Sequence, residues 1–347
     1  MKSVLVTFIF TFSLTAFSQY TETINSNRPG LSYGAYGVGN QVIQLETGIS
    51  FGNDNHALRL ADANIFGVDY AIRYGLNMDR LEIILDGRFL SQRETLLVGG
   101  QNRTFEASNF ERNTIGAKFL VFDPWIEREQ SGPVLTSWKA NNTFQWFHLV
   151  PAVSVYAGAN IALGRESPFM PPNTPNVSPR LAVITQHNYS RWVFVSNFIY
   201  DRFTTDFAMF AGIFTLTHTL SKNVSVFGEF QTIIDDFYAD ELFRFGGAYL
   251  FNRNFQVDAF GLINFKDTPQ RWQIGLGVSY RIDEYHKEEF IFKSNQQKEE
   301  FKVREEVQDK KIRMIVILFC HPLSLLPERQ KKITRLANMS ILKKLNN

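Results

Sequence analysis

Ionisable side chains recur at every second position within stretches that otherwise look like apolar strands. Glu46 stands between Leu45 and Thr47, and Lys118 stands between Ala117 and Phe119. Because successive residues of a strand point to opposite faces, the charges share one face and the apolar residues share the other. The candidates for the polar face are Glu46, Asp69, Arg73, Glu82, Asp86, Arg88, Lys118, Glu229, Gln231, Asp258 and Arg281.

Two interpretations of this polar face stay open. Acids and bases inside a barrel can cross-link its strands, since a buried charge needs a partner. They can also produce a transverse field in a water-filled pore, which selects solutes by charge and dipole. Both roles favour a polar lumen over an apolar core. We therefore predict that the charged candidates line a pore.

The same residues give little support for catalysis. Glu82 and Asp86 lie roughly 13 Å apart along a strand, too far for a carboxylate pair in acid–base work. The six histidines have no zinc-ligand spacing, and neither a Gly-x-Ser-x-Gly motif nor a nucleotide-binding loop is present. A lipid hydrolase using His187 or His218 as its base stays as an alternative. We expect no enzymatic activity, no metal and no cofactor.

The last strand-like stretch, Trp272 to Ile282, shows the pattern most clearly. Apolar residues occupy one face, and small or polar residues such as Gln273 and Arg281 occupy the other. Trp272 and Tyr280 are separated by roughly 26 Å of extended chain, or about 20 Å of depth when the strand is tilted. That spacing is typical of the aromatic rims of an outer-membrane barrel. A secreted β-sandwich is the alternative, and the aromatic rims count against it.

Similar alternation predicts about twelve strands, an even number as in single-chain bacterial barrels. They are expected at 43–51, 66–76, 81–89, 115–121, 148–161, 180–189, 191–202, 207–220, 223–234, 242–251, 254–264 and 271–282. The predicted fold class is therefore all-β, a transmembrane antiparallel up-and-down barrel. It carries a short N-terminal polar segment and a charged C-terminal tail.

The connections between these strands give an independent check. Every second link should be a short periplasmic turn, as at 77–79, 189–190, 221–223 and 252–254. The opposite links are expected to be longer outer loops, as at 52–63, 94–109 and the proline-rich 165–179. Residues 123–147 break this rule, since they are too long for a periplasmic turn. They are expected to form an inner plug, a periplasmic helix or an extra hairpin.

The N-terminus predicts export to a Gram-negative outer membrane. Residues 1–18 combine one positive charge, an apolar stretch and small residues before Gln19, which indicates a cleaved signal peptide. Residues 19–40 form a periplasmic or plug segment before the barrel at 41–283. Asn27, Arg28 and Pro29 are the plug candidates, and we expect Arg28 to pair with Glu46 or Asp69.

Composition separates the tail from the barrel. The chain has 33 Phe and 12 Tyr, and both residue types suit strands and interfaces. Residues 284–347 contain 14 basic and 9 acidic residues, and are predicted to be helical or disordered. Their alternatives are a periplasmic extension, a basic patch or the product of an altered reading frame. Cys320 is the sole cysteine, so an intrachain disulfide is excluded. The sequence shows no basic stripe with interleaved aromatic residues, so it does not indicate nucleic-acid binding.

Several short motifs resemble one known family. They are Asn27-Arg28-Pro29, Gly39 to Gly48, Gly116-Ala117-Lys118, Val226 to Glu229, Val257-Asp258-Ala259 and Gly275 to Arg281. Together they resemble the outer-membrane β-barrel family named for the meta-pathway of phenol degradation. The resemblance implies a barrel that passes small, hydrophobic or aromatic molecules. The family commonly has Asp before Arg-Pro, where this chain has Asn27.

The sequence thus predicts a channel or transporter for small solutes. The expected partners are outer-membrane lipid, small solutes and the barrel-assembly machinery. The alternatives are a structural or surface-binding barrel, whose loops 94–109 and 165–179 would carry its function, and the lipid-modifying enzyme.

Overall fold

A computed structural model describes residues 23–76, 78–124, 149–163, 167–170, 175–236 and 239–286 of this protein. Twelve strands make up almost all of the regular structure in these ranges, with one short 3-10 helix at Ala57–Arg59. The strands are β1 Ile43–His56, β2 Ala61–Gly75, β3 Leu81–Val98, β4 Gln101–Phe122, β5 Ala152–Ile161, β6 Val177–Tyr189, β7 Trp192–Asp201, β8 Met209–Thr219, β9 Val224–Asp235, β10 Ala239–Asn252, β11 Phe255–Asn264 and β12 Gln270–Ile282.

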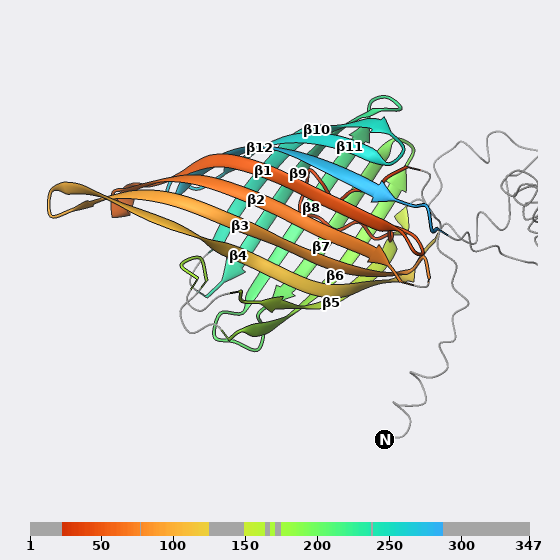
Figure 1. The fold of residues 1–347 in the computed structure, drawn as a ribbon, viewed down its shortest axis with the longest axis horizontal. Coiled ribbons are helices and arrows are strands. Elements are labelled where there is room, and N and C mark those ends of the chain that lie inside the picture. Colours follow the sequence, from red (N-terminus) through yellow and green to blue (C-terminus); the bar gives the residue numbers. More distant parts are fainter. Residues whose placement is uncertain are drawn as a thin grey trace, which may run out of the picture. The chain divides into compact units, whose positions relative to one another are not determined.

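The strands form a closed barrel in which each pairs with its neighbours in the chain (Figure 1). The ring closes where β1 pairs with β12, from Ile43 opposite Ile282 to Asn55 opposite Gln270. Every neighbouring pair is antiparallel, from β1 with β2 around to β11 with β12. The predicted up-and-down barrel of twelve strands is confirmed.

Alternation along each strand separates an apolar exterior from a largely polar interior. On β12, Leu276 is 58% exposed while Ser279 is fully buried. Gln273 and Arg281 also point inward, as the sequence predicted. An exterior of exposed Leu, Ile, Val and aromatic side chains would be costly in water, and it suits the hydrocarbon core of a membrane.

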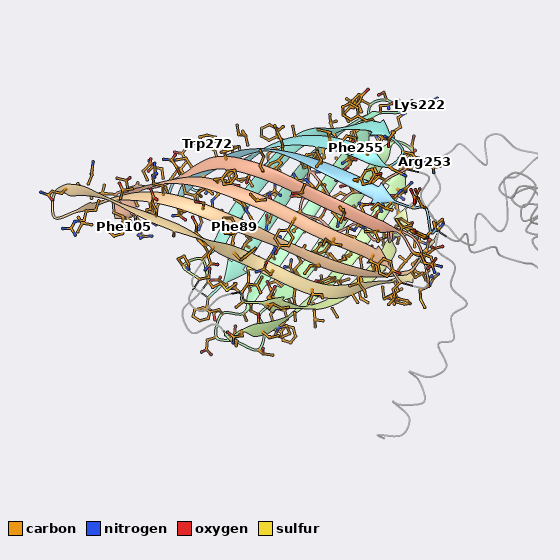
Figure 2. The ribbon with its side chains drawn as sticks, in the orientation of Figure 1. Phe89, Phe105, Lys222, Arg253, Phe255 and Trp272 are labelled. Carbon is orange, nitrogen blue, oxygen red and sulfur yellow. The ribbon has the colours of Figure 1, made fainter. Side chains whose placement is uncertain are left out.

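Aromatic side chains mark both rims of this exterior. In Figure 2, Trp272 and Phe89 lie toward the end of the barrel from which the β3–β4 hairpin projects, and Phe255 lies toward the opposite end. Trp272 and Tyr280 are both about half exposed. Aromatic rings at two levels are typical of the interfaces between lipid and water.

The predicted short turns all lie at one end of the barrel, which we call the turn end. Tyr189 pairs directly with Trp192, and Asn252 pairs with Phe255. At the opposite loop end, β1 to β4 are longer than predicted, and the loops expected at 52–63 and 94–109 are wrong. β3 and β4 instead pair as far as Val98 opposite Gln101, with Gly99 and Gly100 at the tip.

The physical reason for this error is the loss of the lipid constraint. Beyond the rim both faces of the hairpin meet water, so apolar alternation ends while backbone pairing continues. Cross-strand contacts support the extension, as where Arg93 pairs with Glu106 at 2.6 Å and Ser91 Oγ lies 2.7 Å from Ser108 Oγ. Figure 1 shows this hairpin projecting beyond the other strands.

Several predictions lie outside the described residues. They are the signal peptide at 1–18, most of the 123–147 link, and the tail beyond residue 286. Within the part of the chain that the structure describes, no helix is long and apolar enough to cross a membrane.

Part of the barrel interior is apolar, which the expectation of a polar lumen did not include. Inward-facing side chains of β3 to β8 form one buried cluster with three residues that precede β1. Its members are Tyr33, Ala35, Tyr36, Ile84, Leu120, Ala152, Tyr156, Ala182, Ile184, Val195, Ile199, Ala211 and Ile213. Of the ten charged side chains predicted to face the lumen, six lie on the remaining strands and four lie on β3 and β4, and none lies on β5 to β8.

We predict that a charge on the apolar exterior destabilises the barrel. Leu276 lies midway between the aromatic rims, so Leu276→Arg should cost about 2–4 kcal/mol in a bilayer. Urea titration in liposomes, followed by heat-modifiable gel migration, measures this loss. Gln101→Arg, at the water-exposed tip of the β3–β4 hairpin, is the matched control and should change nothing. Equal stability of both variants would refute the membrane-facing assignment.

Candidate functional site: the occupied lumen

Residues 23–40, which we call the inner segment, cross the lumen as coil. Tyr33 N donates to Asn197 Oδ1 at 2.7 Å, and Asn197 Nδ2 donates back to Tyr33 O at 2.9 Å. Ala35 N donates to Gln186 Oε1 at 2.8 Å, and Ser154 Oγ donates to Ala35 O at 2.6 Å. A buried coil has no ladder to satisfy its backbone groups, so side chains of the wall do so.

Arg28 joins the inner segment to the wall through a two-pronged ion pair. Its Nε and Nη2 donate to the two carboxylate oxygens of Asp258 at 3.2 and 3.1 Å. The guanidinium lies over Gly48 and Gly277, where an added Cβ would come within 2.2 and 2.1 Å of Nη2. The two glycines therefore leave the space that Arg28 fills.

The predicted partners of Arg28 were wrong. Glu46 instead accepts from Asn27 N at 3.3 Å and pairs with Arg73 at 3.1 Å. Asp69 lies 3.7 Å from Arg88. Arg28 does lie against β1, over Gly48, but its guanidinium bonds Asp258 of β11 and not the acids of β1 and β2.

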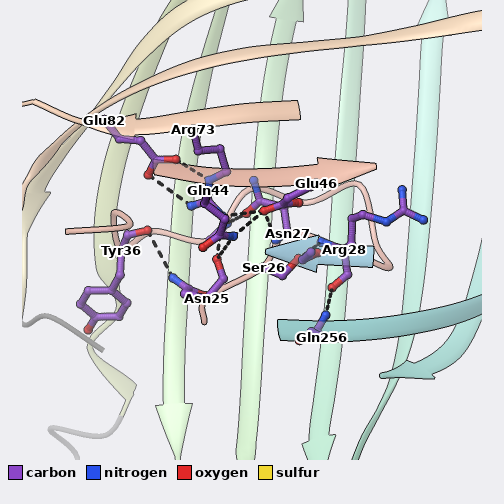
Figure 3. Close-up of polar contacts among 12 residues, drawn as sticks. Asn25, Ser26, Asn27, Arg28, Tyr36, Gln44, Glu46, Arg73, Glu82 and Gln256 are labelled. Atoms are coloured by element: carbon purple, nitrogen blue, oxygen red, sulfur yellow. Dashed lines mark hydrogen bonds and ion pairs between the residues drawn. The ribbon is translucent and has the colours of Figure 1, made fainter. Parts of the chain in front are cut away.

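A cluster of charges lies on β1 to β4, and Figure 3 shows its members Glu46, Arg73 and Glu82. Arg73 pairs with Glu82 and Glu46, and Lys118 Nζ lies 3.0 Å from Glu82. Arg73 Nη1 also donates to Asn25 O at 2.6 Å. All four charged side chains are at most 2% exposed. Two cations against two anions leave no uncompensated charge, which is what permits such burial.

Glu229 on β9 holds the middle of the inner segment. Its carboxylate accepts from Leu31 N at 2.9 Å, from Ser32 N at 3.3 Å and from Thr215 Oγ1 at 2.8 Å. Arg244 from β10 supplies the compensating charge. Glu229 thus combines an ion pair within the wall with hydrogen bonds to the inner segment. Because the acceptor is an ionised carboxylate, these bonds are stronger than bonds between neutral groups.

A further contact between the inner segment and the wall lies where the segment enters β1. Asn40 N donates to Asp79 Oδ1 at 2.6 Å, in the turn between β2 and β3. Burial raises the pKa of the Asp79 carboxyl above its ordinary value, and the hydrogen bond from Asn40 acts in the opposite direction. The bond therefore offsets part of what burial costs this carboxylate.

The remaining charged candidates also face the interior. Asp86 accepts from Tyr33 Oη at 2.8 Å and lies 3.4 Å from Arg112. Arg281 lies 3.4 Å from Asp283 at the turn end. All ten charged candidates point inward, and their role in lining a pore stays a prediction.

The two histidines considered as catalytic bases contact aromatic rings. The ring centroids of His218 and Trp192 are 4.0 Å apart, and those of His187 and Phe194 are 6.3 Å apart. Both occupy outward-facing positions near the turn end. Among the described residues, no group of three His, Cys, Asp or Glu side chains is placed to hold a metal ion.

Sequence reasoning missed several charged residues of the interior, among them Arg112, Arg180, Asp201, Asp240 and Arg244. Arg180 and Arg244 are buried at inward-facing positions of β6 and β10. Extending the alternation over the whole of each strand would have found both. The strands were recognised from their apolar positions. Arg180 and Arg244 have uncharged neighbours, Pro179 and Phe245, so no run of charges drew attention to them.

Three cavities lie along the lumen. A loop-end cavity of about 300 Å³ is lined by Phe169, Pro175 and Arg202, and a turn-end cavity of about 370 Å³ by Lys222 and Asn223. A middle cavity of about 140 Å³ lies next to the inner segment. Asn27, Arg28 and Gly30 line both the middle and the turn-end cavities, so this part of the segment separates them.

A family model described as "Putative MetA-pathway of phenol degradation" matches residues 26–282. The chain belongs to this family. The match runs from the inner segment to the last residue of β12, so it includes both the wall and the chain within it.

Solved structures that resemble the chain are barrels of low sequence identity. The NanC porin has 7% identity and a TM-score of 0.43, over 69% of this chain and 100% of that one. The toluene transporter TodX from Pseudomonas putida has 9% identity and a TM-score of 0.40, over 70% and 90%. The translocator domain of the autotransporter NalP from Neisseria meningitidis has 8% and 0.40, over 70% and 89%. A search of curated proteins finds no match.

We predict that a side chain at Gly48 displaces Arg28. In Gly48→Ala the new Cβ would collide with the guanidinium, which is its nearest neighbour, and break the ion pair with Asp258. The inner segment should then become more accessible, measured as at least tenfold faster proteolysis between residues 23 and 32 in the folded barrel. Gly228→Ala is the control, because its Cβ meets only Phe243 at an ordinary 3.7 Å. Unchanged cleavage in Gly48→Ala would contradict this role of the ion pair.

Proposed function

We propose that this protein is an outer-membrane channel for small solutes and that the inner segment is its plug. The observation that carries the proposal is the separation of the middle and turn-end cavities by residues 27–30, held by the polar contacts of Arg28 and its neighbours. Membership of a family named for phenol degradation supports aromatic molecules as the solutes. The charged residues on the inner faces would line the path.

The two halves of the plug differ in what holds them. Tyr33 and Tyr36 belong to the apolar cluster, and each tyrosine ring buries on the order of 150–250 Å², worth about 4–6 kcal/mol. Residues 25–32 are held mainly by polar contacts. A neutral hydrogen bond contributes about 0.5–1.5 kcal/mol net and one to a charged group, such as Asp258 or Glu229, about 1.5–3 kcal/mol. Opening therefore requires the polar stretch 25–32 to move while the tyrosines stay.

This division matches the positions of the cavities. The polar stretch includes the residues that separate the middle cavity from the turn-end cavity. Leu31 also lines the loop-end cavity, which shares several wall residues with the middle one. Movement of residues 25–32 alone would thus join the three cavities into one path, and of the apolar contacts it would remove only those that Leu31 makes with the cluster.

A surface-binding barrel without transport is the second candidate, and the projecting β3–β4 hairpin favours it. Both candidates share the location in the outer membrane and a need for the barrel-assembly machinery. Export through the signal peptide at 1–18 belongs to the same proposal. Conductance separates the candidates, because only the first passes current.

We predict that a disulfide between the plug and the wall closes the channel. Ser26 Oγ lies 2.7 Å from Ser279 Oγ, which is close enough for cysteines at these positions to bond. In a Cys320→Ser background, oxidised Ser26→Cys/Ser279→Cys protein should give no current in planar bilayers. Reduction should restore the stepwise currents of the parent.

The single variant Ser26→Cys is the control, and oxidation should leave its currents unchanged. A parent protein that stays silent at all voltages would refute the channel and leave the surface-binding barrel. Equal currents from the oxidised and reduced double variant would refute the plug.

A further inference from the structure

Arg180 is a buried cation that lacks a partner of its own. It lies on β6, is 6% exposed and lines the middle cavity. Its Nε has no hydrogen-bond partner, and no ion pair reaches its guanidinium among the residues that the structure describes. Because an arginine in a protein interior cannot lose its proton, such a site calls for an anion.

The nearby acids are already engaged. Asp86 is bound by the Tyr33 hydroxyl at 2.8 Å and lies 3.4 Å from Arg112. Glu46, another acid of the same cavity wall, belongs to the cluster around Arg73. These carboxylates make their ion pairs with other cations, and none of them makes one with Arg180.

Asp201 stands directly across from Arg180 in the pairing of β6 with β7. Its Oδ1 accepts from Asn160 Nδ2 at 2.5 Å and from Arg202 N at 3.0 Å. The carboxylate is thereby held by β5 and by the residue that follows β7, and neither of its oxygens forms an ion pair with Arg180.

The rest of the middle cavity is apolar on one side. Ile199, Ala211 and Ile213 line it and belong to the buried apolar cluster, and Met209 lies beside them. Four carboxylates and three arginines line the cavity, and Arg180 is the one of these arginines without an ion pair among the described residues. A ligand that presents a negative group to Arg180 would place an apolar body against these side chains. A volume of about 140 Å³ suits a body of about one aromatic ring.

The approach from the loop end favours anions. Five arginines line the loop-end cavity, against Asp69, Glu111 and Asp201. Each of the five also lies within ion-pair distance of a carboxylate, so the excess is one of the lining residues alone. This cavity shares Leu31, Arg112, Met209 and Gln231 with the middle one, so the two adjoin. An excess of one sign of charge in a narrow cavity raises the local concentration of the opposite sign.

We propose that the middle cavity binds aromatic carboxylates, with the carboxylate on the Arg180 guanidinium and the ring against Ile199 and Ile213. A planar guanidinium can bond both oxygens of a carboxylate at once, which distinguishes it from a lysine. This inference deepens the proposed function, since it names the class of solute that the channel would pass.

The first test compares three probes on the purified full chain in detergent by isothermal titration calorimetry. Sodium benzoate has the charge and the ring, benzyl alcohol has the ring alone, and sodium acetate has the charge alone. Benzoate should bind at least tenfold more tightly than either of the others. No binding of benzoate, or equal binding of benzyl alcohol, would overturn the proposal without reference to any variant.

The second test uses variants at Arg180. Arg180→Gln should weaken benzoate binding at least tenfold, while Arg180→Lys should retain part of it. Arg103→Gln, which removes the same charge from the exposed β3–β4 hairpin, is the control and should bind as the parent does. A merely structural Arg180 predicts a less stable Arg180→Gln barrel. If Arg180 has no ion pair, the Arg180→Gln barrel should resist urea as well as the parent or better when benzoate is absent.

The outcomes separate this proposal from the channel itself. Benzoate binding in a protein that passes no current would support the site and refute the channel. Current without benzoate binding would support the channel and refute the site. Benzoate binding that Arg180→Gln leaves unchanged would overturn the assignment to Arg180.

Discussion

The structure depends on the pairing of β1 with β12, which closes the sheet on itself. In lipid an unpaired strand edge would leave a row of N–H and C=O groups without partners, at several kcal/mol each. Pairing from Ile43 to Asn55 removes that edge. Closure also determines the environment of the alternating side chains, because one face of each strand then meets lipid and the other meets an enclosed lumen. The exposed leucines and aromatic rings and the buried charges are two results of the same constraint.

Because the lumen is enclosed, each charge that is buried on an inner face needs an opposite charge or hydrogen bonds to compensate it. The wall meets this need partly by itself, as in the cluster of Arg73, Glu46, Glu82 and Lys118. The inner segment completes the rest, because Asp258 has Arg28 and Glu229 has the backbone of Leu31 and Ser32. The segment is therefore part of the electrostatic balance of the lumen as well as an obstacle within it.

Within that balance the apolar and polar contacts have different consequences for movement. The tyrosines of the inner segment pack against β3 to β8 and are expensive to expose. The polar stretch before them can exchange its hydrogen bonds for water, and its movement also has to break the Arg28–Asp258 ion pair. A closed state that opens through its polar half reconciles a well-filled barrel with a path for solutes. Arg180 fits this scheme, as a cation that the closed protein leaves for an incoming anion.

Alternation in the sequence was sufficient for the twelve strands and for the inward direction of residues such as Lys118 and Arg281, because these depend on local periodicity. The resemblance to the family came instead from short motifs. Alternation failed beyond the rim, where the β3–β4 hairpin continues without lipid to impose a pattern. It also could not pair Arg28 with Asp258, or show that Arg180 has no partner. Those depend on which strands face each other across the closed lumen and on the path of a coil within it. Only the tertiary structure decides such contacts, since they join residues that are distant in the sequence, and no short-range pattern specifies the distance between their charges.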